Sequence, residues 1–351
     1  ASVIVFPSLV FPYVDALTGT LYSFAIFAVA FITRPIGSLI FMAIDRRYGR
    51  GTKLTAALFL LGSSTVAIAF LPGYETIGHY AAVVLIVLRA AQGIALGGTW
   101  DGLASLLSLN APQHQRGWYA MVPQLGAPLA LLVASGLFAF FLLNLSEADF
   151  LSWGWRYPFF VAFAINVVAL FARLRIVVTH EFERLFEQRD LVPSPVLPTV
   201  KREGRNIILG AFAPLASFAL FHMVTVFPLS WIALYTEQPI ERFLVIEMIG
   251  ASVGLLAIVV SGFIADQIGR RSLLGWSAGG IAIFALMAPL LLDGGDLGEV
   301  AFMILGLLVI HRWHMLLGEV SLSVPLLAGP SLSLCNDLAA GDFRSAPRKS
   351  H

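Results

Sequence analysis

The chain contains very little charge and almost no cysteine. Lys, Arg, Asp and Glu together form 12% of its 351 residues, and Cys335 is the one cysteine. A single cysteine excludes an internal disulfide framework and a cysteine-rich metal site. The net charge of +1 gives no electrostatic reason to expect nucleic-acid binding. The sequence also lacks the Gly-x-x-x-x-Gly-Lys-Ser/Thr loop that cradles phosphates, so we do not expect ATP to drive its function.

Hydrophobic residues, by contrast, form 58% of the chain. Soluble domains average about 45–50% apolar and about 25% charged residues. A soluble chain with this surplus would expose apolar patches well above the roughly few hundred Å² that monomers usually tolerate. A lipid bilayer removes this difficulty because it is itself an apolar solvent. The composition therefore predicts an integral membrane protein.

A membrane-spanning helix needs about 20 largely apolar residues. A ninth apolar stretch begins near Val300 and is interrupted at His311. Eight stretches meet the requirement, and we expect an all-α polytopic transmembrane bundle that contains them: residues 18–44, 54–72, 80–108, 118–141, 155–174, 206–235, 242–265 and 272–292.

The loops between these stretches alternate in charge. Lys and Arg gather near residues 45–53, 110–117, 173–205 and 266–271, whereas the intervening loops carry mainly Asp and Glu. Cytoplasmic loops of membrane proteins carry an excess of Lys and Arg. The alternation predicts a multi-pass protein of the cell inner membrane whose central loop is cytoplasmic.

A sequence segment that recurs within the chain predicts two internal repeats. The segment Asp45–Arg50 resembles the segment Asp266–Arg271, and six predicted helices separate the two. Six-helix parallel repeats build known transporter folds. We therefore expect four regions: an N-terminal bundle over residues 1–174, a central linker over 175–205, a partial C-terminal bundle over 206–310 and an atypical tail over 311–351.

Both ends of the chain indicate a shortened form of this architecture. Residues 1–10 look like the last turns of a helix, so we expect the first helix to be largely missing and a complete form to have twelve helices. The tail 311–351 is rich in Ser, Pro, Leu and Gly and has no 20-residue apolar run. Two interpretations of the tail stay open, namely a shifted reading frame or truncation near residue 310 and a divergent, partly disordered terminus.

Five segments carry a family resemblance: Phe31–Gly37, Leu88–Gly98, Pro123–Pro128, Trp153–Phe159 and Gly262–Arg271. In them the chain resembles the major facilitator superfamily, and within it the metabolite:proton symporters that include shikimate, α-ketoglutarate, citrate and proline/betaine carriers. The resemblance covers about residues 5–310. It implies two six-helix bundles that rock around a central site.

The loop motif of this family reads Gly-x-x-x-Asp-x-x-Gly-Arg-Lys/Arg. In the first copy, Met42 occupies the Gly position, and Asp45 lies one residue before the Asp position, which is Arg46. Arg50 matches the motif, but Gly51 replaces its final base. The second copy is intact and predicts a gate in which acid and bases pair and separate, the alternative being a topological anchor of positive charge: Gly262, Asp266, Gly269, Arg270 and Arg271.

Arg89 is the strongest candidate for a functional charge at membrane depth. A charge there costs about 2.5–3.5 kcal/mol on insertion scales, so it is retained only when it faces a cavity or a partner. Gln92 and Gly93 share its helix face, and Trp100 returns nearly to the same direction. By resemblance, this segment matches a motif associated with proton coupling. Two roles stay open: a cavity-lining guanidinium, and a structural Arg bonded to carbonyls of a neighbouring helix.

Three further ionisable residues are candidates for the substrate or proton pathway. Asp101 lies about 120° around the helix from Arg89, either along the path or as a solvated acid near the helix end. His222 is a candidate proton relay because histidine as a residue type changes charge in the physiological range, although a lone helix histidine is more often simply hydrogen-bonded. Glu247 is either a proton site or a helix-end acid paired with Arg242.

These features predict a secondary active transporter, and the resemblance implies proton-coupled symport of a small organic acid or zwitterion. The expected partners are that substrate, a proton and the lipid bilayer. We expect a monomer without cofactor or metal, driven by the proton gradient. Clustered catalytic residues are missing from the sequence, so we do not expect an enzyme. The alternative is a non-transporting or degenerate sensor of the same fold, favoured by the altered first loop.

Overall fold

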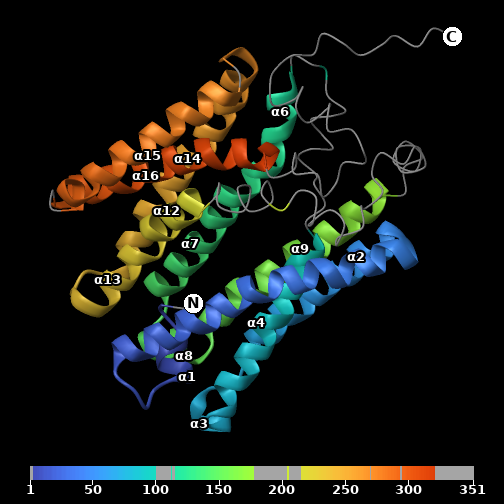
Figure 1. Ribbon diagram of the computed structural model, residues 1–351. Coiled ribbons are helices and arrows are strands. Elements are labelled where there is room, and N and C mark those ends of the chain that lie inside the picture. Colours follow the sequence, from blue (N-terminus) through green and yellow to red (C-terminus); the bar gives the residue numbers. More distant parts are fainter. Residues whose placement is uncertain are drawn as a thin grey trace, which may run out of the picture.

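The computed structural model describes the backbone of residues 3–99, 112, 115–177, 204, 215–268, 270–292 and 295–320. Within this part of the chain the regular elements are all helical, as the sequence predicts (Figure 1). They are α1 (Phe6–Val10), α2 (Ala16–Ala69), α3 (Tyr74–Ile77), α4 (Tyr80–Thr99), α6 (Arg116–Met121), η2 (Val122–Leu125), α7 (Gly126–Asn144), α8 (Glu147–Ser152), η3 (Gly154–Arg156), α9 (Tyr157–Val177), α12 (Leu215–Thr225), α13 (Phe227–Tyr235), α14 (Ile240–Ile268), α15 (Arg270–Leu292) and α16 (Gly295–Val320).

Seven of the eight predicted stretches correspond to helical segments long and apolar enough to cross a bilayer. These are Ala16–Gly49, Gly51–Ala69, Tyr80–Thr99, Val122–Asn144, Gly154–Ala172, Phe218–Tyr235 and Ile240–Ile264. The eighth stretch, 272–292, lies in α15, but its described apolar part, Ala278–Leu292, is shorter than a full span. The stretch predicted from residue 206 is divided near Val226, because Pro228 sits at the start of α13.

Two spans of α2 are joined at Gly49 with almost no intervening chain. Gly49 has φ +82° and ψ 166°, while the residues on both sides are helical. Nothing lies within 4 Å of the position that a Cβ would take there, so steric contact does not require the glycine. The positive φ does require it, since other residues rarely adopt that conformation. The turn returns the chain antiparallel after a single non-helical residue.

The helices form two groups that meet along α7. The helices α2, α4 and α9 pack together, and α14, α15 and α16 form the other group (Figure 1). Around Trp155, one buried cluster joins α1 to the ends of α2, α4 and α9. Around Met303, a second cluster joins α12, α14, α15 and α16. The helix α7 precedes α9 in the chain but packs chiefly along α14, so it connects the predicted N-terminal and C-terminal bundles.

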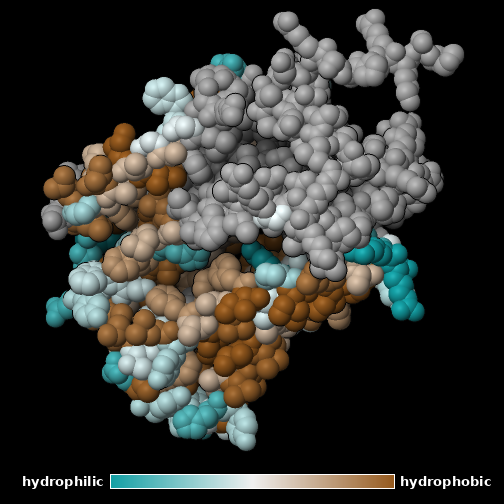
Figure 2. Space-filling view, viewed as in Figure 1, coloured by the Kyte–Doolittle hydropathy of each residue, from teal (hydrophilic) through white to brown (hydrophobic). Residues whose placement is uncertain are grey.

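Large apolar side chains cover the outer surface of both groups. Ile32, Phe59, Phe171 and Leu286 are each more than 60% exposed to solvent. Figure 2 shows broad hydrophobic areas on the face that it displays, with hydrophilic residues towards the ends of the helices. In water this surface would be unfavourable, whereas lipid tails match it. The surface therefore agrees with the composition in indicating a bilayer.

Two of the predicted region boundaries fall inside helices. The helix α9 continues to Val177, past the predicted end of the first bundle at residue 174. The helix α16 continues to Val320, across the predicted boundary at residue 310. Residues 178–203 of the predicted linker and residues 321–351 of the predicted tail lie outside the described residues.

Candidate functional site

Arg89 lies midway along α4 and is half-buried. The carbon atom of its guanidinium lies 5.5 Å from the centre of the Phe27 ring and 5.9 Å from the centre of the Phe6 ring. Its Nη1 donates a hydrogen bond to Gln92 Oε1 over 3.1 Å. No described carboxylate forms an ion pair with Arg89. A cation at this depth is thus held by aromatic faces and one amide, without a counter-ion from the described residues.

Gln92 also forms a hydrogen bond with the second span of α2. Its Nε2 donates to Thr65 Oγ1 over 2.9 Å, and the residue is 8% exposed. Both ends of the buried amide are therefore satisfied, which avoids the cost of an unpaired polar group. Gln92 shares the helix face of Arg89, as the sequence predicts, and the structure adds the hydrogen bond between them and the contact with Thr65.

The glycines of α4 allow the approach of a helix. A Cβ on Gly93 would overlap Thr33 Oγ1 and the carbonyl oxygen of Ala30, both on α2. Thr33 Oγ1 also donates to the Ala90 carbonyl across the same contact, over 3.2 Å. A neighbouring helix, α2, therefore occupies the space beside Gly93. Small residues in such contacts are typical of membrane helix pairs.

His222 lies on α12, and its ring centre is 6.1 Å from the ring centres of both Phe27 and Phe31 of α2. Its Nδ1 lies 2.8 Å from the Phe218 carbonyl oxygen. A carbonyl oxygen only accepts, so Nδ1 carries the hydrogen in this contact, and Nε2 of a neutral ring is an acceptor. Phe27 thus lies between Arg89 of the first bundle and His222 of the second.

Glu247 on α14 is buried against α7. Ser135 Oγ donates to Glu247 Oε2 over 2.7 Å, and each residue is 4% exposed. The sequence offered Arg242 as a possible partner, but the described contact of Glu247 is with Ser135. Among the described residues, Glu247 takes part in no ion pair.

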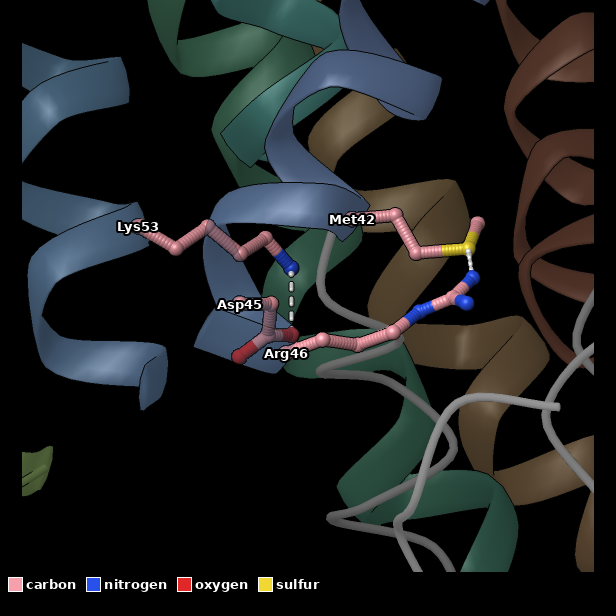
Figure 3. A network of polar contacts seen from close by, with 4 residues as sticks. All are labelled: Met42, Asp45, Arg46 and Lys53. Atoms are coloured by element: carbon pink, nitrogen blue, oxygen red, sulfur yellow. Dashed lines mark hydrogen bonds and ion pairs between the residues drawn. The ribbon is translucent and has the colours of Figure 1, made fainter. Parts of the chain in front are cut away.

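The first loop motif forms contacts within its own helical hairpin. Figure 3 shows Lys53 Nζ directed at Asp45 Oδ2, at a distance of 3.5 Å. Arg46 Nη2 lies 3.0 Å from Met42 Sδ instead of facing the acid. The acid that lies one residue early is therefore paired with Lys53, which the sequence did not identify. Arg50 is helical, but its side chain lies outside the described residues.

Of the five residues that define the second loop motif, Gly262 is the one whose surroundings the structure describes. Gly262 lies against Met121, whose Cγ and Sδ would be 3.1 Å from an added Cβ, so α6 and α14 approach closely there. The side chains of Asp266, Arg270 and Arg271 lie outside the described residues, and so do Gly269, Trp100 and Asp101. The predicted gate at the second loop therefore stays a prediction.

A cleft of about 460 Å³ lies between the first residues of the chain and α13, and Asp15, Thr20 and Leu234 contribute to its lining. This volume falls in the usual range for small-molecule sites, about 300–1,000 Å³. Asp15 caps α2, because its carboxylate accepts the backbone N–H of Thr18 over 2.9 Å. That hydrogen bond lowers the pKa of Asp15, so the lining includes a carboxylate that stays ionised at neutral pH.

Sequence reasoning missed the partners that define these sites. Phe6, Phe27, Thr65 and Ser135 are ordinary residues of apolar helices, and their spacing carries no signal of the residues that they touch. Ser135 is a polar residue inside an apolar helix, which was a weak available signal. Among the described residues, His, Cys, Asp and Glu nowhere gather in a group that could hold a metal ion.

The sequence matches known membrane transporters along most of its length. A model of the Major Facilitator Superfamily matches residues 2–345. The inner membrane metabolite transport protein YhjE of Escherichia coli is 37% identical over 316 residues, which cover 88% of this chain and 71% of that protein. The shikimate transporter of Escherichia coli is 34% identical over 266 residues, which cover 74% of this chain and 60% of that protein. The proline/betaine transporter of the same organism is 27% identical over 312 residues, which cover 86% of this chain and 62% of that protein.

A solved structure shares the fold. The xylose transporter XylE from Escherichia coli, in a partially occluded inward-open conformation, aligns with a TM-score of 0.61 at 16% sequence identity. The alignment covers 94% of this chain and 89% of that chain. At this identity the likeness supports the helical architecture alone.

Proposed function

The chain belongs to the major facilitator superfamily, and we propose that it is a secondary active transporter that couples movement of a small organic anion or zwitterion to movement of protons. It is a multi-pass membrane protein, and its matched relatives are transporters and not enzymes. Those relatives include shikimate and proline/betaine transporters, and each of these molecules carries a carboxylate. In this proposal the proton gradient supplies the energy and no cofactor takes part.

The observation that carries the substrate class is the environment of Arg89. A guanidinium has five N–H donors in a planar fork, and one of them is directed at Gln92. The rings of Phe6 and Phe27 contact the cation but offer no negative charge. A carboxylate fits the remaining donors in a bidentate manner and neutralises the charge. A substrate carboxylate therefore supplies what the described residues near Arg89 lack.

The contacts of α7 and α12 support alternating access. The helix α7 packs along α14, and His222 of α12 faces α2, so both predicted bundles contribute to the same central region. Rocking of the bundles about these contacts would open a path from either side. We propose that the basic loops and the central linker face the cytoplasm, in accordance with the distribution of Lys and Arg.

The test is uptake into proteoliposomes with an imposed inward proton gradient, in which labelled shikimate, proline and glycine betaine are offered separately. We expect accumulation of at least one of these compounds and loss of the accumulation when a protonophore is added. Accumulation that survives the protonophore would contradict proton coupling. Binding without flux would favour the non-transporting sensor, for which the altered first loop at Asp45 and Arg46 is the supporting observation.

A pair of arginine variants tests the substrate site. Removing one partner of a buried, hydrogen-bonded charge pair costs about 2–5 kcal/mol, so Arg89→Gln should lower uptake about 30-fold or more. The matched control is Arg34→Gln on α2, where the guanidinium carbon lies 5.8 Å from the centre of the Phe31 ring. We expect this control to stay within about threefold of the parent. Equal losses in both variants would contradict a specific role of Arg89.

A further inference from the structure

Glu247 and Ser135 form a polar contact inside an otherwise apolar interface between α14 and α7. Ser135 Oγ and Glu247 Oε2 are 2.7 Å apart, and both residues are almost fully buried. Leu131, one turn before Ser135 on α7, packs against the buried cluster that contains Phe243 and Ile246 of α14. Apolar side chains therefore lie within about one helical turn of Ser135 on α7 and of Glu247 on α14.

A single hydroxyl is a poor environment for a buried carboxylate. Buried charges are normally paired with an opposite charge or with several donors. Among the described residues, Ser135 is the donor to Glu247, and no Lys, Arg or His pairs with it. The helix α7 carries no ionisable side chain, and α13 carries only Tyr235. A neutral carboxylic acid avoids the cost of burying a charge, and it can both donate and accept hydrogen bonds.

The other ionisable groups around α14 are engaged or distant. Glu241 and Arg242 lie near the start of α14, more than one turn before Glu247. On α16, Glu299 accepts a hydrogen bond from Gln238 Nε2 over 3.4 Å.

The basic residues of α6 and α15 belong to the opposite end of α14. Met121 of α6 contacts Gly262, and α15 begins directly after α14 ends. Leu307 of α16 lies beside Gly250, which comes after Glu247 on α14. The ionisable residues of α16 after position 310 come later in the chain than Leu307, so this helix carries them away from Glu247. The remaining acid of α16, Asp296, has its side chain outside the described residues.

We propose that Glu247 binds one proton of the transport cycle and that Ser135 holds the protonated acid at the contact between α7 and α14. This inference rests on the proposed alternating-access function. With the proton bound, the acid is neutral and the two helices can pack closely. Release of the proton to a water molecule yields a carboxylate and a hydronium ion, and the carboxylate then needs water around it. Proton release therefore favours separation of α7 from α14, which belong to different predicted bundles.

Infrared difference spectroscopy tests the proton site without a substrate. The protein is reconstituted in lipid, and spectra are recorded as the pH is raised. The parent should show a carbonyl band of a neutral carboxylic acid that persists at neutral pH. Glu247→Gln should lack this band, and Ser135→Ala should shift its frequency, because the hydrogen bond to the acid is lost. Identical carboxylic-acid bands in the parent and in Glu247→Gln would overturn the proposal.

Transport of labelled shikimate separates the proton step from substrate movement. Glu247→Gln should lose proton-driven accumulation by about tenfold or more, yet keep exchange of internal for external shikimate, which needs no net proton release. Glu241→Gln, which alters an acid at the start of the same helix, should keep both activities. Full proton-driven accumulation by Glu247→Gln would overturn the proposal, and so would equal loss of accumulation and exchange. If the parent accumulates proline or glycine betaine instead of shikimate, that compound replaces shikimate in both assays. If the parent transports none of the three compounds, that result counts against the proposed function, while the infrared spectra still decide on Glu247.

Discussion

The contact between α4 and α2 at Gly93 permits a quantitative prediction about stability. A Cβ at Gly93 would overlap Thr33 Oγ1 and the Ala30 carbonyl oxygen, and it would lie 2.8 Å from the Ala30 carbonyl carbon. Ordinary contacts of Cβ atoms begin at 3.4 Å. The obstacle includes backbone, which cannot rotate away as the end of a side chain can. Gly93→Ala must therefore push α4 away from α2.

The expected size follows from two opposing terms. Overpacking of a well-packed contact costs about 1–3 kcal/mol. Alanine is preferred over glycine within a helix by about 0.5–1 kcal/mol, which offsets part of that cost. We expect Gly93→Ala to lower the free energy of unfolding by about 1 kcal/mol, the middle of the net range of about 0–2.5 kcal/mol. The matched control is Gly279→Ala on α15, where a Cβ would meet nothing within 4 Å. The control should gain about 0.5–1 kcal/mol, since only the helix preference changes.

Thermal unfolding of the purified protein in detergent is the assay. In soluble domains of about 150–250 residues, 1 kcal/mol shifts Tm by about 2–4 °C, so the two variants should move in opposite directions by a measurable amount. The contrast between them isolates the steric cost, because the helix preference is common to both. Equal Tm shifts for Gly93→Ala and Gly279→Ala would refute the close packing of α4 on α2.

Two further predictions concern single polar contacts. The cap hydrogen bond lowers the pKa of Asp15 below its ordinary 3.8, so its stabilisation is complete above about pH 4 and is lost as the pH falls through the lower folded value. Asp15→Asn keeps a capping oxygen and should remove this dependence from Tm measured between about pH 2.5 and 6, whereas an unchanged slope would contradict the assignment. Lys53→Met leaves the Asp45 carboxylate, which is 10% exposed, without this partner and should cost about 1–3 kcal/mol in chemical unfolding. Adding Asp45→Asn should recover most of that loss, and an equally unstable double variant would show that the ion pair is not the cause.

The membrane helices were predictable because each one is specified locally. A run of apolar residues long enough to cross the bilayer has few alternatives to a helix, because its backbone groups must form their hydrogen bonds with one another in lipid. The pairing of Arg89 with Gln92 was predictable for the same reason, since three positions along a helix bring two side chains to one face. The break near Val226 was missed, although Pro228 was visible in the sequence.

Contacts between helices were not predictable from one sequence. Nothing local to Glu247 points to Ser135, which lies on another helix more than a hundred residues earlier. The ring of Phe27 resembles any other lipid-facing phenylalanine until α4 and α12 are placed beside it. Helix registration depends on packing of whole surfaces, and the apolar residues that decide it are too alike to carry a unique pattern.

The single-residue connection at Gly49 also has a consequence for biosynthesis. A proteolytic nick or an inserted epitope needs an exposed stretch of extended chain, and this turn provides only one non-helical residue. Because a single non-helical residue separates the two spans, we expect them to enter the bilayer together as a helical hairpin. Arg46, Arg47 and Lys53 flank the tip of this hairpin, and their charges oppose its passage across the membrane. We therefore expect the tip of this hairpin to stay on the cytoplasmic side of the membrane.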